Sequence, residues 1–502
     1  MNQPNGSYIF DPPPDRAATE AGQAGNWLVT ALARGGTQLI QFGALTITTR
    51  MLTPADFGKV AMILGIIGIT GIFRDLGLTA ATIHSPTVTH EKINTLFWIN
   101  TLAGLVITVA SMALAPFVAS WYGDAQLTSL TIVLSLGFAI NSLGAQHGAL
   151  LQRKLEFKLL ARLQVITAAA TGILSSAMAL AGFGIWSLIW PMLLASAMGA
   201  ALQWHYCQWR PSTPRYDAGA SSMLGFGRNL ILFGLLDFIA HNLHNVMLGR
   251  LAGAIQVGYY NRAFNLLQMV TGYVQDPARR ITSPLLSRLT QHAEQFEREY
   301  LKAVQVMAYL LAPLSMLALV CAQDIVRLLF GAQWAASASI LQILALGSVA
   351  QAVCASTGWI YLSRNETARM MRWGVIGWSW MLLCLLFGLR HGANGIAWAY
   401  TASMVSLLIP CLVYALKGTT FGAGKVLNIL ATPVTAAACG ASVLWMRPYF
   451  ISSHPVINLA ISGTLSLSLW LTVTLIIPDG RQVLNQLWRL INAHIRRPAI
   501  KW

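Results

Sequence analysis

The sequence predicts an all-α polytopic membrane protein of about fourteen transmembrane helices, with both termini in the cytoplasm. Three observations lead to this prediction. The 502 residues are 55% hydrophobic and only 10% charged, whereas charged residues make up about a quarter of a globular protein, and the mean hydropathy is +0.58. Apolar windows of about 20 residues recur along the whole chain. Basic residues gather in every second connection between the windows.

Each predicted helix corresponds to one apolar window long enough to cross a bilayer. Short connections separate the windows, and none of the outer ones is long enough to fold as a domain. The windows lie near residues 27–50, 58–83, 94–115, 127–150, 160–181, 184–205, 223–248, 259–284, 303–321, 336–362, 373–389, 395–416, 426–445 and 457–477.

The distribution of basic residues predicts the orientation. Connections after even-numbered windows carry most of the bases, such as Lys92, Arg153 and Arg210, and the opposite connections carry fewer, such as Arg50 and Arg447. The positive-inside rule therefore places both termini in the cytoplasm. The formal net charge of +16 follows from this topology, so we expect no nucleic acid partner.

The windows and their connections divide the chain into six parts. The first residues lack the apolar core of a signal peptide, and the last residues form a basic amphipathic segment. The predicted parts are a disordered cytoplasmic tail (1–26), an N-terminal transmembrane lobe (27–205), a cytoplasmic linker (206–222), a C-terminal transmembrane lobe (223–416), two additional transmembrane helices (417–477) and a basic cytoplasmic tail (478–502).

The stretch from Leu52 to His84 has a counterpart about 200 residues later in the chain. It opens with Thr53-Pro54-Ala55-Asp56-Phe57-Gly58, a turn that predicts a helix start, and Gly258 corresponds to Gly58 in the counterpart. Two further segments recur in the same order: Trp121-Tyr122-Gly123 as Leu329-Phe330-Gly331, and Gly184-Ile185-Trp186 as Gly395-Ile396-Ala397. The chain therefore consists of two similar halves, and repeats of this kind place a transport pathway at their interface.

Residue patterns for catalysis, cofactors and metals do not occur in this sequence. The six cysteines lie in or beside apolar windows without metal-ligand or disulfide spacing, and we interpret them as small core residues. There is no phosphate-binding GxxxxGK[ST] loop, no HExxH pattern and no Ser/His/Asp arrangement. We therefore expect neither an enzyme nor a cofactor or metal site.

Polar residues within the first two windows are candidates for substrate binding, because ionisable groups at membrane depth are costly and are usually functional. Arg34, Gln38 and Gln41 are spaced to share one helix face. In the second window Arg74 precedes Asp75. Two alternatives stand beside this interpretation: Arg34 reaches the membrane interface as a snorkelling side chain, or Arg74 and Asp75 form a structural ion pair.

The seventh window holds the densest polar cluster of any window. Asp237, His241 and His244 recur at helical spacing, with Asn242 and Asn245 beside them. A desolvated carboxylate has a raised pKa and histidine titrates near neutrality, so these residues are candidates for coupling transport to an ion gradient. The alternative is that they hydrogen-bond to neighbouring helices.

The eighth window contributes Arg262 and Arg279 as candidate ligands for phosphate, because the planar guanidinium group makes paired charge-assisted hydrogen bonds. The alternative for Arg262 is an ordinary outer-loop residue, and we prefer that interpretation for Arg250. Asp276-Pro277 predicts a kink or a break in this helix.

Five segments carry a resemblance to the Wzx-type flippases of lipopolysaccharide and exopolysaccharide, which are polysaccharide transporters of the multidrug/oligosaccharidyl-lipid/polysaccharide exporter superfamily. The first two segments in tandem are the more specific ones, and the resemblance extends over residues 25–480. The segments are Leu52-Thr-Pro-Ala-Asp-Phe-Gly58, Asp75-Leu-Gly-Leu-Thr-Ala80, Trp121-Tyr-Gly123, Gln152-Arg-Lys-Leu-Glu-Phe157 and Gly184-Ile-Trp186.

The resemblance implies two pseudo-symmetric helical lobes around a central, cation-lined cavity that opens alternately to each side. The implied substrate is an undecaprenyl-pyrophosphate-linked oligosaccharide repeat unit that crosses the bacterial inner membrane. Coupling to an ion gradient would drive this movement. The lipid-linked oligosaccharide and membrane lipids would be its partners, and the polymerase and export machinery are further candidates.

Three alternatives belong to other functional classes. A drug/cation antiporter of the same superfamily would have an acidic cavity, which the excess of arginine over acid in the windows disfavours. A lipid II flippase would also handle pyrophosphate. A membrane scaffold for a polysaccharide synthase complex would leave the charges within the windows without a purpose.

Overall fold

The protein is helical in a computed structural model. The model describes the backbone of residues 20–75, 79, 82–83, 88–214, 221–449, 452 and 454–485, and the side chains of these residues except 20–34, 70–75, 221–237 and 239–241. This described part contains helices and no strand. The prediction of an all-α protein is therefore confirmed.

The chain divides between Gly258 and Tyr259 into two compact units. The predicted domain ranges stay predictions. The first unit contains the start of the long helix α10 (Ser221–Arg288) and, in the described part of the chain before it, the following helices. These are α2 (Glu20–Met51), α3 (Pro54–Asp75), α5 (His90–Ala113), α6 (Ala115–Tyr122), α7 (Gln126–Arg153), α8 (Phe157–Leu180) and α9 (Trp186–Tyr206).

The second unit contains the rest of α10 and the helices after it. These are α11 (Ala293–Val320), α12 (Ala322–Leu329), η2 (Ala332–Trp334), α13 (Ala335–Ser363), α14 (Thr367–Gly388), η3 (Leu389–His391), α15 (Gly392–Leu416), α16 (Ala423–Ala441), α17 (Val443–Met446), η4 (Arg447–Tyr449) and α18 (Pro455–Ile476).

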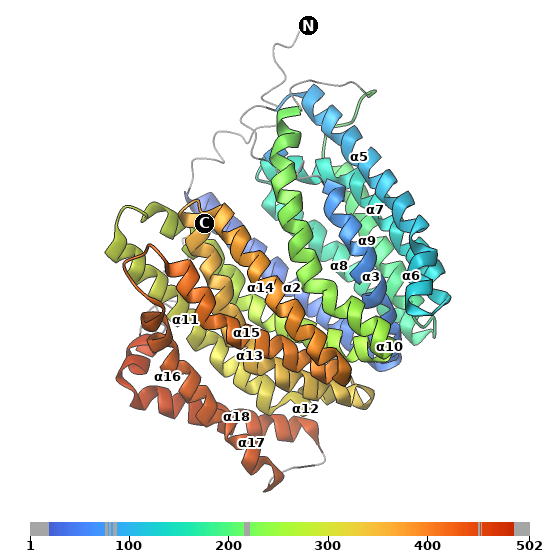
Figure 1. Ribbon diagram of the computed structural model, residues 1–502. Helices are drawn as coiled ribbons and strands as arrows, with labels where there is room; N and C mark the ends of the chain where they lie inside the picture. The colour runs from blue at the N-terminus through green and yellow to red at the C-terminus, as the bar shows by residue number, and fades with distance from the viewer. Residues whose placement is uncertain are drawn as a thin grey trace. The chain divides into compact units, whose positions relative to one another are not determined.

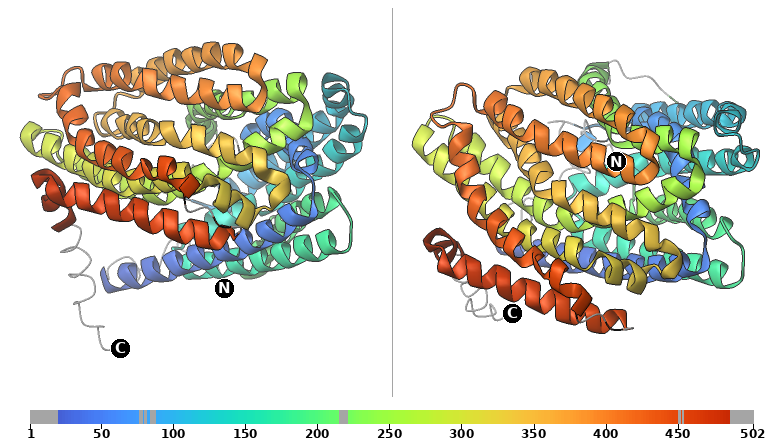
Figure 2. Two further views of the ribbon diagram at one scale, coloured as in Figure 1. Left: turned by 90° about the horizontal axis from the view of Figure 1, so that it is seen from below. Right: turned by 60° about the horizontal axis from the view of Figure 1, so that its bottom comes forward.

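Helix contacts follow the same scheme in the two units. In the first, α5 packs on α7, and α9 packs on both α7 and α8. In the second, α11 packs on α13, and α15 packs on both α13 and α14, so that α13, α14 and α15 lie side by side in Figure 1. Helices α16 and α18 pack on each other and on α11, and Figure 2 shows them in red on one side of this unit.

The connections between the helices also repeat. Leu155, after α7, and Asn365, after α13, both have a φ of 57°. In each case the following residue donates its amide N–H to a carbonyl five residues back, from Glu156 to Leu151 at 3.1 Å and from Glu366 to Tyr361 at 2.8 Å. This is the left-handed helix end of a Schellman motif. The sequence repeat therefore has a structural counterpart.

Aromatic side chains close one end of each unit in equivalent places. Trp209, just after α9, lies 5.8 Å from the Phe97 ring of α5, and Phe421, just after α15, lies 5.8 Å from the Tyr300 ring of α11. All four rings are buried. The segment after α9 is thereby fixed to α5, and the segment after α15 to α11.

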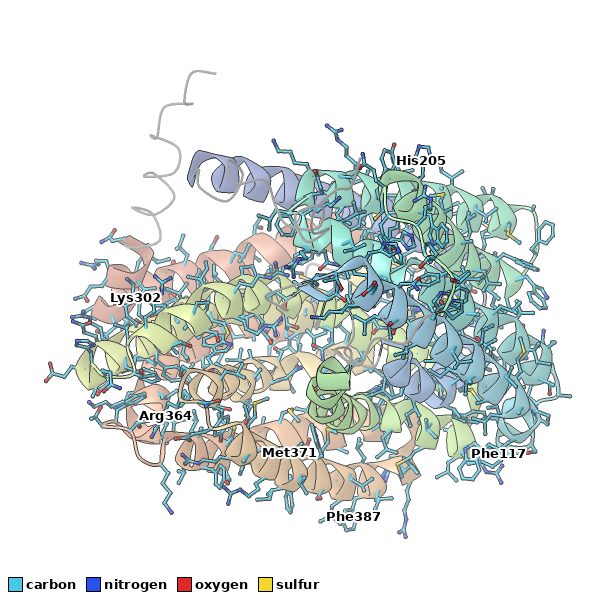
Figure 3. All side chains as sticks on the ribbon, turned by 90° about the horizontal axis from the view of Figure 1, so that it is seen from above. Phe117, His205, Lys302, Arg364, Met371 and Phe387 are labelled. Atoms are coloured by element: carbon cyan, nitrogen blue, oxygen red, sulfur yellow. The ribbon has the colours of Figure 1, made fainter. Side chains whose placement is uncertain are left out.

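The outer surfaces of the helices are apolar, as a lipid environment requires. Phe387 of α14 is 73% exposed, and Figure 3 shows it pointing away from the helices. Figure 3 also places Lys302 and Arg364 at one end of the second unit. Within the described residues, nine helical stretches are long and apolar enough to cross a membrane, or ten if α2 and α3 form one bent span. The protein is a multi-pass membrane protein.

Every predicted window overlaps a helix, whereas the total of fourteen spans stays a prediction. The prediction for Asp276-Pro277 is wrong in its stronger form, because α10 continues past Pro277 to Arg288 without a break. Pro277 is exposed, so the carbonyl group that loses its helical partner lies on an open side of the helix. The backbone of α10 leaves helical geometry instead at Gly253.

Candidate functional site

The turn that opens α3 is capped by its own side chains. Thr53 donates its amide N–H and its hydroxyl to the Asp56 carboxylate at 2.9 and 2.7 Å, and the Asp56 amide N–H donates to the Thr53 hydroxyl at 3.4 Å. This reciprocal arrangement satisfies backbone donors that have no partner within the helix. The predicted helix start is confirmed, and it fixes the position of Gly58.

Helices α3 and α10 touch each other through their backbones at Gly58 and Gly258. A Cβ atom on Gly58 would lie 2.6 Å from the carbonyl carbon of Ala254, and one on Gly258 would lie 2.7 Å from that of Pro54. Both pairs combine residues 54 and 58 with residues 254 and 258, so the contact has a local two-fold relation. The structure thus brings the turn that opens α3 against its counterpart in the repeat, around Gly258, a contact that the sequence repeat alone did not predict.

This close approach needs the break in α10. Gly253 has φ 81° and ψ 172°, a conformation that residues with a Cβ atom rarely adopt. Further along the pair, a Cβ atom on Gly65 would lie 3.1 Å from the Val246 side chain, and one on Gly249 would lie 2.8 Å from Met62 and Tyr122. Small residues that let two helices approach closely are typical of helix packing in membranes.

A polar network lies beside this contact. The Lys59 ammonium group lies 2.8 Å from the Asp124 carboxylate and donates to Gln126 Oε1 at 2.7 Å. Burial alone would raise the pKa of Asp124. The hydrogen bond and charge of Lys59, together with the Gln126 amide N–H at 3.0 Å, instead hold this pKa below its usual range. Arg250 lies with its guanidinium carbon 5.6 Å from the centre of the Trp121 ring.

Asp124→Asn is expected to destabilise the protein only where the carboxyl group of the wild type is ionised. Because folding lowers the pKa of Asp124, its contribution is present above the unfolded value of about 3.9 and disappears as the pH falls through the folded pKa. The difference in melting temperature between wild type and variant should therefore shrink to zero under strong acid. Glu299→Gln is a control on an exposed ion pair. A difference that does not change with pH would contradict this assignment.

The predicted ion-coupling residues are only partly within the described side chains. His244 is 2% exposed and Asn245 is 4% exposed, and both lie on the part of α10 that faces α3 near Gly65. The side chains of Asp237 and His241 lie outside the described residues. His244 is therefore buried next to Asn245, which contacts α3, and its role in coupling stays a prediction.

Two further predicted residues lie on the part of α10 in the second unit. Arg262 is half-buried and Arg279 is exposed. Between them, Gln268 accepts a hydrogen bond from Gln351 Nε2 at 3.1 Å and one from the Thr271 hydroxyl at 3.2 Å. Guanidinium groups are chemically suited to anions and carboxamides to hydroxyl groups, and the role of these residues stays a prediction.

Of the predicted residues of the first two windows, the structure describes the side chains of Gln38 and Gln41. On α2, Gln38 is half-buried and Gln41 is exposed, while Ile40 and Ala44 make the contact with Gly172 of α8. The two glutamines therefore lie away from α8. The side chains of Arg34 and Arg74 lie outside the described part of the chain.

The comparison with protein families matches residues 47–339 to the model of a family described as "Polysaccharide biosynthesis protein". Similar proteins include the succinoglycan biosynthesis transport protein ExoT of Rhizobium meliloti, with 26% identity over 94% of this chain and 96% of that protein. The teichuronic acid biosynthesis protein TuaB of Bacillus subtilis is 26% identical over 76% of this chain and 79% of that protein. The lipopolysaccharide biosynthesis protein WzxC of Escherichia coli is 24% identical over 64% of this chain and 65% of that protein.

Two solved structures share the fold at low sequence identity. The lipid II flippase MurJ in an inward closed conformation has a TM-score of 0.71 and 13% identity, over 89% of this chain and 98% of that chain. An inward-facing multidrug resistance transporter of the MATE family has a TM-score of 0.58 and 14% identity, over 78% of this chain and 95% of that chain. The fold is therefore that of these transporters.

Proposed function

The chain belongs to the family of polysaccharide biosynthesis proteins, and on this premise we propose that it is a flippase of the bacterial inner membrane. Its substrate is an undecaprenyl-pyrophosphate-linked oligosaccharide repeat unit, which it moves from the cytoplasmic to the periplasmic leaflet for exopolysaccharide or lipopolysaccharide assembly. The resemblance to Wzx-type proteins predicted from the sequence agrees with this family.

The observation that carries the proposal is the similarity to ExoT. It extends over nearly the whole of both chains, and the name of that protein states transport in the biosynthesis of a polysaccharide. TuaB and WzxC are named for two other bacterial polysaccharides. Relatives that are named for different polysaccharides are consistent with one transport step that acts on different sugars.

The proposed architecture is fourteen spans in two pseudo-symmetric lobes around a central cavity, with both termini in the cytoplasm. The repeated helix ends at Leu155 and Asn365 support two equivalent halves. Bases at one end of the second unit, such as Lys302 and Arg364, support a cytoplasmic position for that end.

Alternating access is the proposed mechanism. In this topology the contact between Gly58 and Gly258 lies at the periplasmic end of α3 and α10 and holds that end closed. Opening requires the two backbones to separate, and only a difference in the binding of substrate or ion to the two states drives that change. Asp237, His241 and His244 are the proposed coupling residues.

The proposed substrate contacts offset the charge of the pyrophosphate. Guanidinium groups bind phosphate oxygens through paired charge-assisted hydrogen bonds, and carboxamides bind sugar hydroxyl groups. The lipid tail stays in hydrocarbon during the crossing. The proposed contacts are Arg34, Gln38, Gln41, Arg74, Arg262 and Arg279.

Arg262→Ala is expected to reduce export at least tenfold, because removal of a half-buried guanidinium group leaves the pyrophosphate without one of its counter-charges. Cells that lack the protein would receive either the wild type or this variant. Lipid-linked oligosaccharide would then be measured separately in the cytoplasmic and periplasmic leaflets. The deletion and Arg262→Ala should both accumulate the repeat unit on the cytoplasmic side.

Arg288→Ala is the matched control, because it removes an exposed arginine from the end of the same helix. It should export normally. If the repeat unit reaches the periplasm in cells without the protein, another protein moves it and the flippase proposal is wrong. Normal export by Arg262→Ala, with the deletion still defective, would reject only the role of this residue.

A second candidate substrate is lipid II, favoured by the similarity of the fold to MurJ. Complementation distinguishes the two, because a lipid II flippase should support growth of cells depleted of their own, whereas an oligosaccharide flippase should not. A drug/cation antiporter should instead lower drug accumulation. Association with a polymerase or other export machinery remains part of the proposal.

A further inference from the structure

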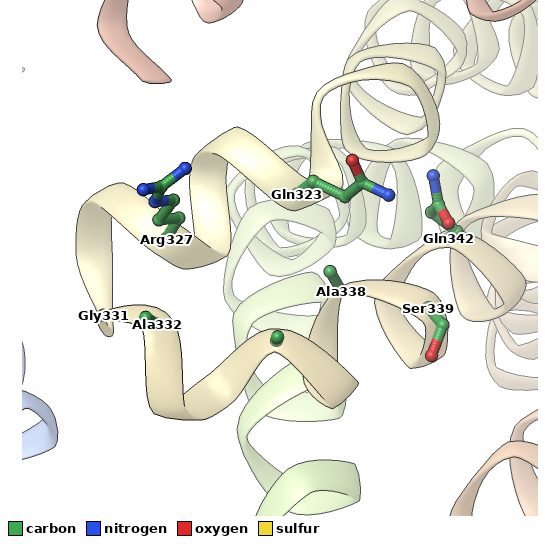
Figure 4. Close-up of a pocket in the computed structure, with 8 residues that line it drawn as sticks. Gln323, Arg327, Gly331, Ala332, Ala338, Ser339 and Gln342 are labelled. Atoms are coloured by element: carbon green, nitrogen blue, oxygen red, sulfur yellow. The ribbon is translucent and has the colours of Figure 1, made fainter. Parts of the chain in front are cut away.

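A cavity of about 400 Å³ opens at one end of the second unit, between α12, η2 and the first turns of α13. It is lined by the small residues Gly331, Ala332 and Ala335, which form its floor, and by the polar side chains of Gln323, Arg327, Ser339 and Gln342. Figure 4 shows the side chain of Gln323 of α12 extending toward Gln342 of α13, and Arg327 one turn further along α12. A cavity of this size holds a small polar ligand.

A buried ion pair fixes the side of α12 that faces away from the cavity. Arg447 pairs with Asp324, whose other oxygen accepts from Asn458 Nδ2 at 3.4 Å. Arg447 and Asp324 are only 6% and 5% exposed, and Arg447 also donates to the Val320 carbonyl at 2.8 Å. Since α12 cannot rotate, Gln323 and Arg327, spaced by one helical turn, are held at the cavity.

The polar groups at the cavity have unused hydrogen-bonding capacity. Within the described part of the chain, the side chains of Gln323 and Arg327 make no hydrogen bond or ion pair. Gln342 donates from Nε2 to the Leu319 carbonyl at 3.1 Å, which leaves its Oε1 atom as an acceptor. Ser339 donates to Asn394 Oδ1 at 3.1 Å. One guanidinium and two carboxamides are thus available to a ligand.

The equivalent positions in the first half of the chain contain different residues. Gly123 corresponds to Gly331: both have a positive φ, and each donates its amide N–H to the carbonyl four residues back, on Ala119 or Arg327. In this register the counterparts of Gln323, Arg327, Ala338 and Gln342 are Ala115, Ala119, Leu130 and Leu134, all of them buried and apolar. The second half alone places a cation and two amides at this point.

We propose that this cavity binds the phosphate ester headgroup of a lipid at the membrane surface. Arg327 binds the phosphate, and Gln323 and Gln342 bind hydroxyl groups attached to it. The segment that lines the cavity, α12 and η2, connects the apolar helices α11 and α13 at their ends, so the cavity lies at the level of the lipid headgroups. Two kinds of lipid share this chemistry. One is an anionic phospholipid with a polyol headgroup. The other is the lipid-linked sugar phosphate, and this second ligand rests on the proposed function.

The test is binding of short-chain lipids to the purified full-length protein in detergent, measured by native mass spectrometry. The probes are dihexanoyl phosphatidylglycerol, dihexanoyl phosphatidylcholine and farnesyl pyrophosphate. We expect phosphatidylglycerol or the pyrophosphate to bind at least tenfold more tightly than phosphatidylcholine. Arg327→Ala should remove this preference, and Arg327→Lys should restore part of it.

Ala335→Leu keeps the cation but fills the exposed floor, and it should also abolish binding. Arg372→Ala removes an exposed arginine elsewhere and should bind as the wild type does. Each variant is accepted only with an unchanged melting temperature. Equal binding by wild type and Arg327→Ala, or an equal loss in Arg372→Ala, overturns the proposal. Binding of phosphatidylglycerol in a protein that exports nothing would support the cavity and reject the proposed function separately.

Discussion

Gly258→Ala is expected to reduce export at least tenfold while the protein still reaches the membrane. The added Cβ atom would lie 2.7 Å from the carbonyl carbon of Pro54, whereas two carbon atoms need about 3.5 Å or more. The obstacle is backbone, which no rotamer change can move aside. The two helices must therefore separate, and overpacking of this kind costs about 1–3 kcal/mol.

That cost falls only on the state in which α3 and α10 touch. A penalty of about 1–3 kcal/mol shifts the equilibrium between the two access states roughly 5- to 150-fold. We would measure export together with the labelling of a cysteine introduced at Met51, an exposed residue just before the turn that makes the contact. Labelling by a membrane-impermeant reagent should increase in Gly258→Ala and in Gly58→Ala, because either substitution prevents closure.

Gly272→Ala is the matched control on the same helix. A Cβ atom there would have no neighbour within 4 Å, and alanine is the better helix former by about 1 kcal/mol. Normal export by this variant would show that α10 tolerates the change as such. If Gly258→Ala exported and labelled as Gly272→Ala does, the contact would have no part in transport.

Hydropathy and the internal repeat were enough to predict the fold class. Lipid and the protein core both select apolar residues, so the windows mark helices well, and the exposed Phe387 and the buried Leu385 of α14 look alike in sequence. The short helices α6 and α12 were not predicted, because each is only eight residues long and falls in the connection after an apolar window. Only the repeated glycines, Gly123 and Gly331, marked where they end.

The candidate site was less predictable, because contacts between distant residues decide it. The repeat identified Gly58 and Gly258 as equivalent, but equivalence alone does not require contact. Asp276-Pro277 was a stronger local signal for a helix break than Gly253, and the structure breaks the helix at the glycine. Arg447 was grouped with the bases of the outer loops, although it is 6% exposed; its partner is 123 residues away, beyond any local pattern.

Removal of Asp324 is expected to destabilise the protein by about 3–5 kcal/mol, since it leaves the guanidinium group of Arg447 buried without its counter-charge. Asp324 and Arg447 join α12 to η4, and Asn458 extends the connection to α18. Asp324→Ala should therefore lower the free energy of unfolding in detergent. It should also loosen α18, because Asn458 loses its acceptor on α12.

The exposed pair of Lys425 and Glu297 provides the comparison. Its lysine is 58% exposed, and exposed pairs contribute about 0–1 kcal/mol, so Glu297→Gln should change the unfolding free energy little. The double variant Asp324→Leu with Arg447→Met should recover most of the loss, because apolar residues of similar volume replace a buried ion pair at little cost. If the double variant were as unstable as Asp324→Ala, the loss would come from the shape of the carboxylate site and not from an uncompensated charge.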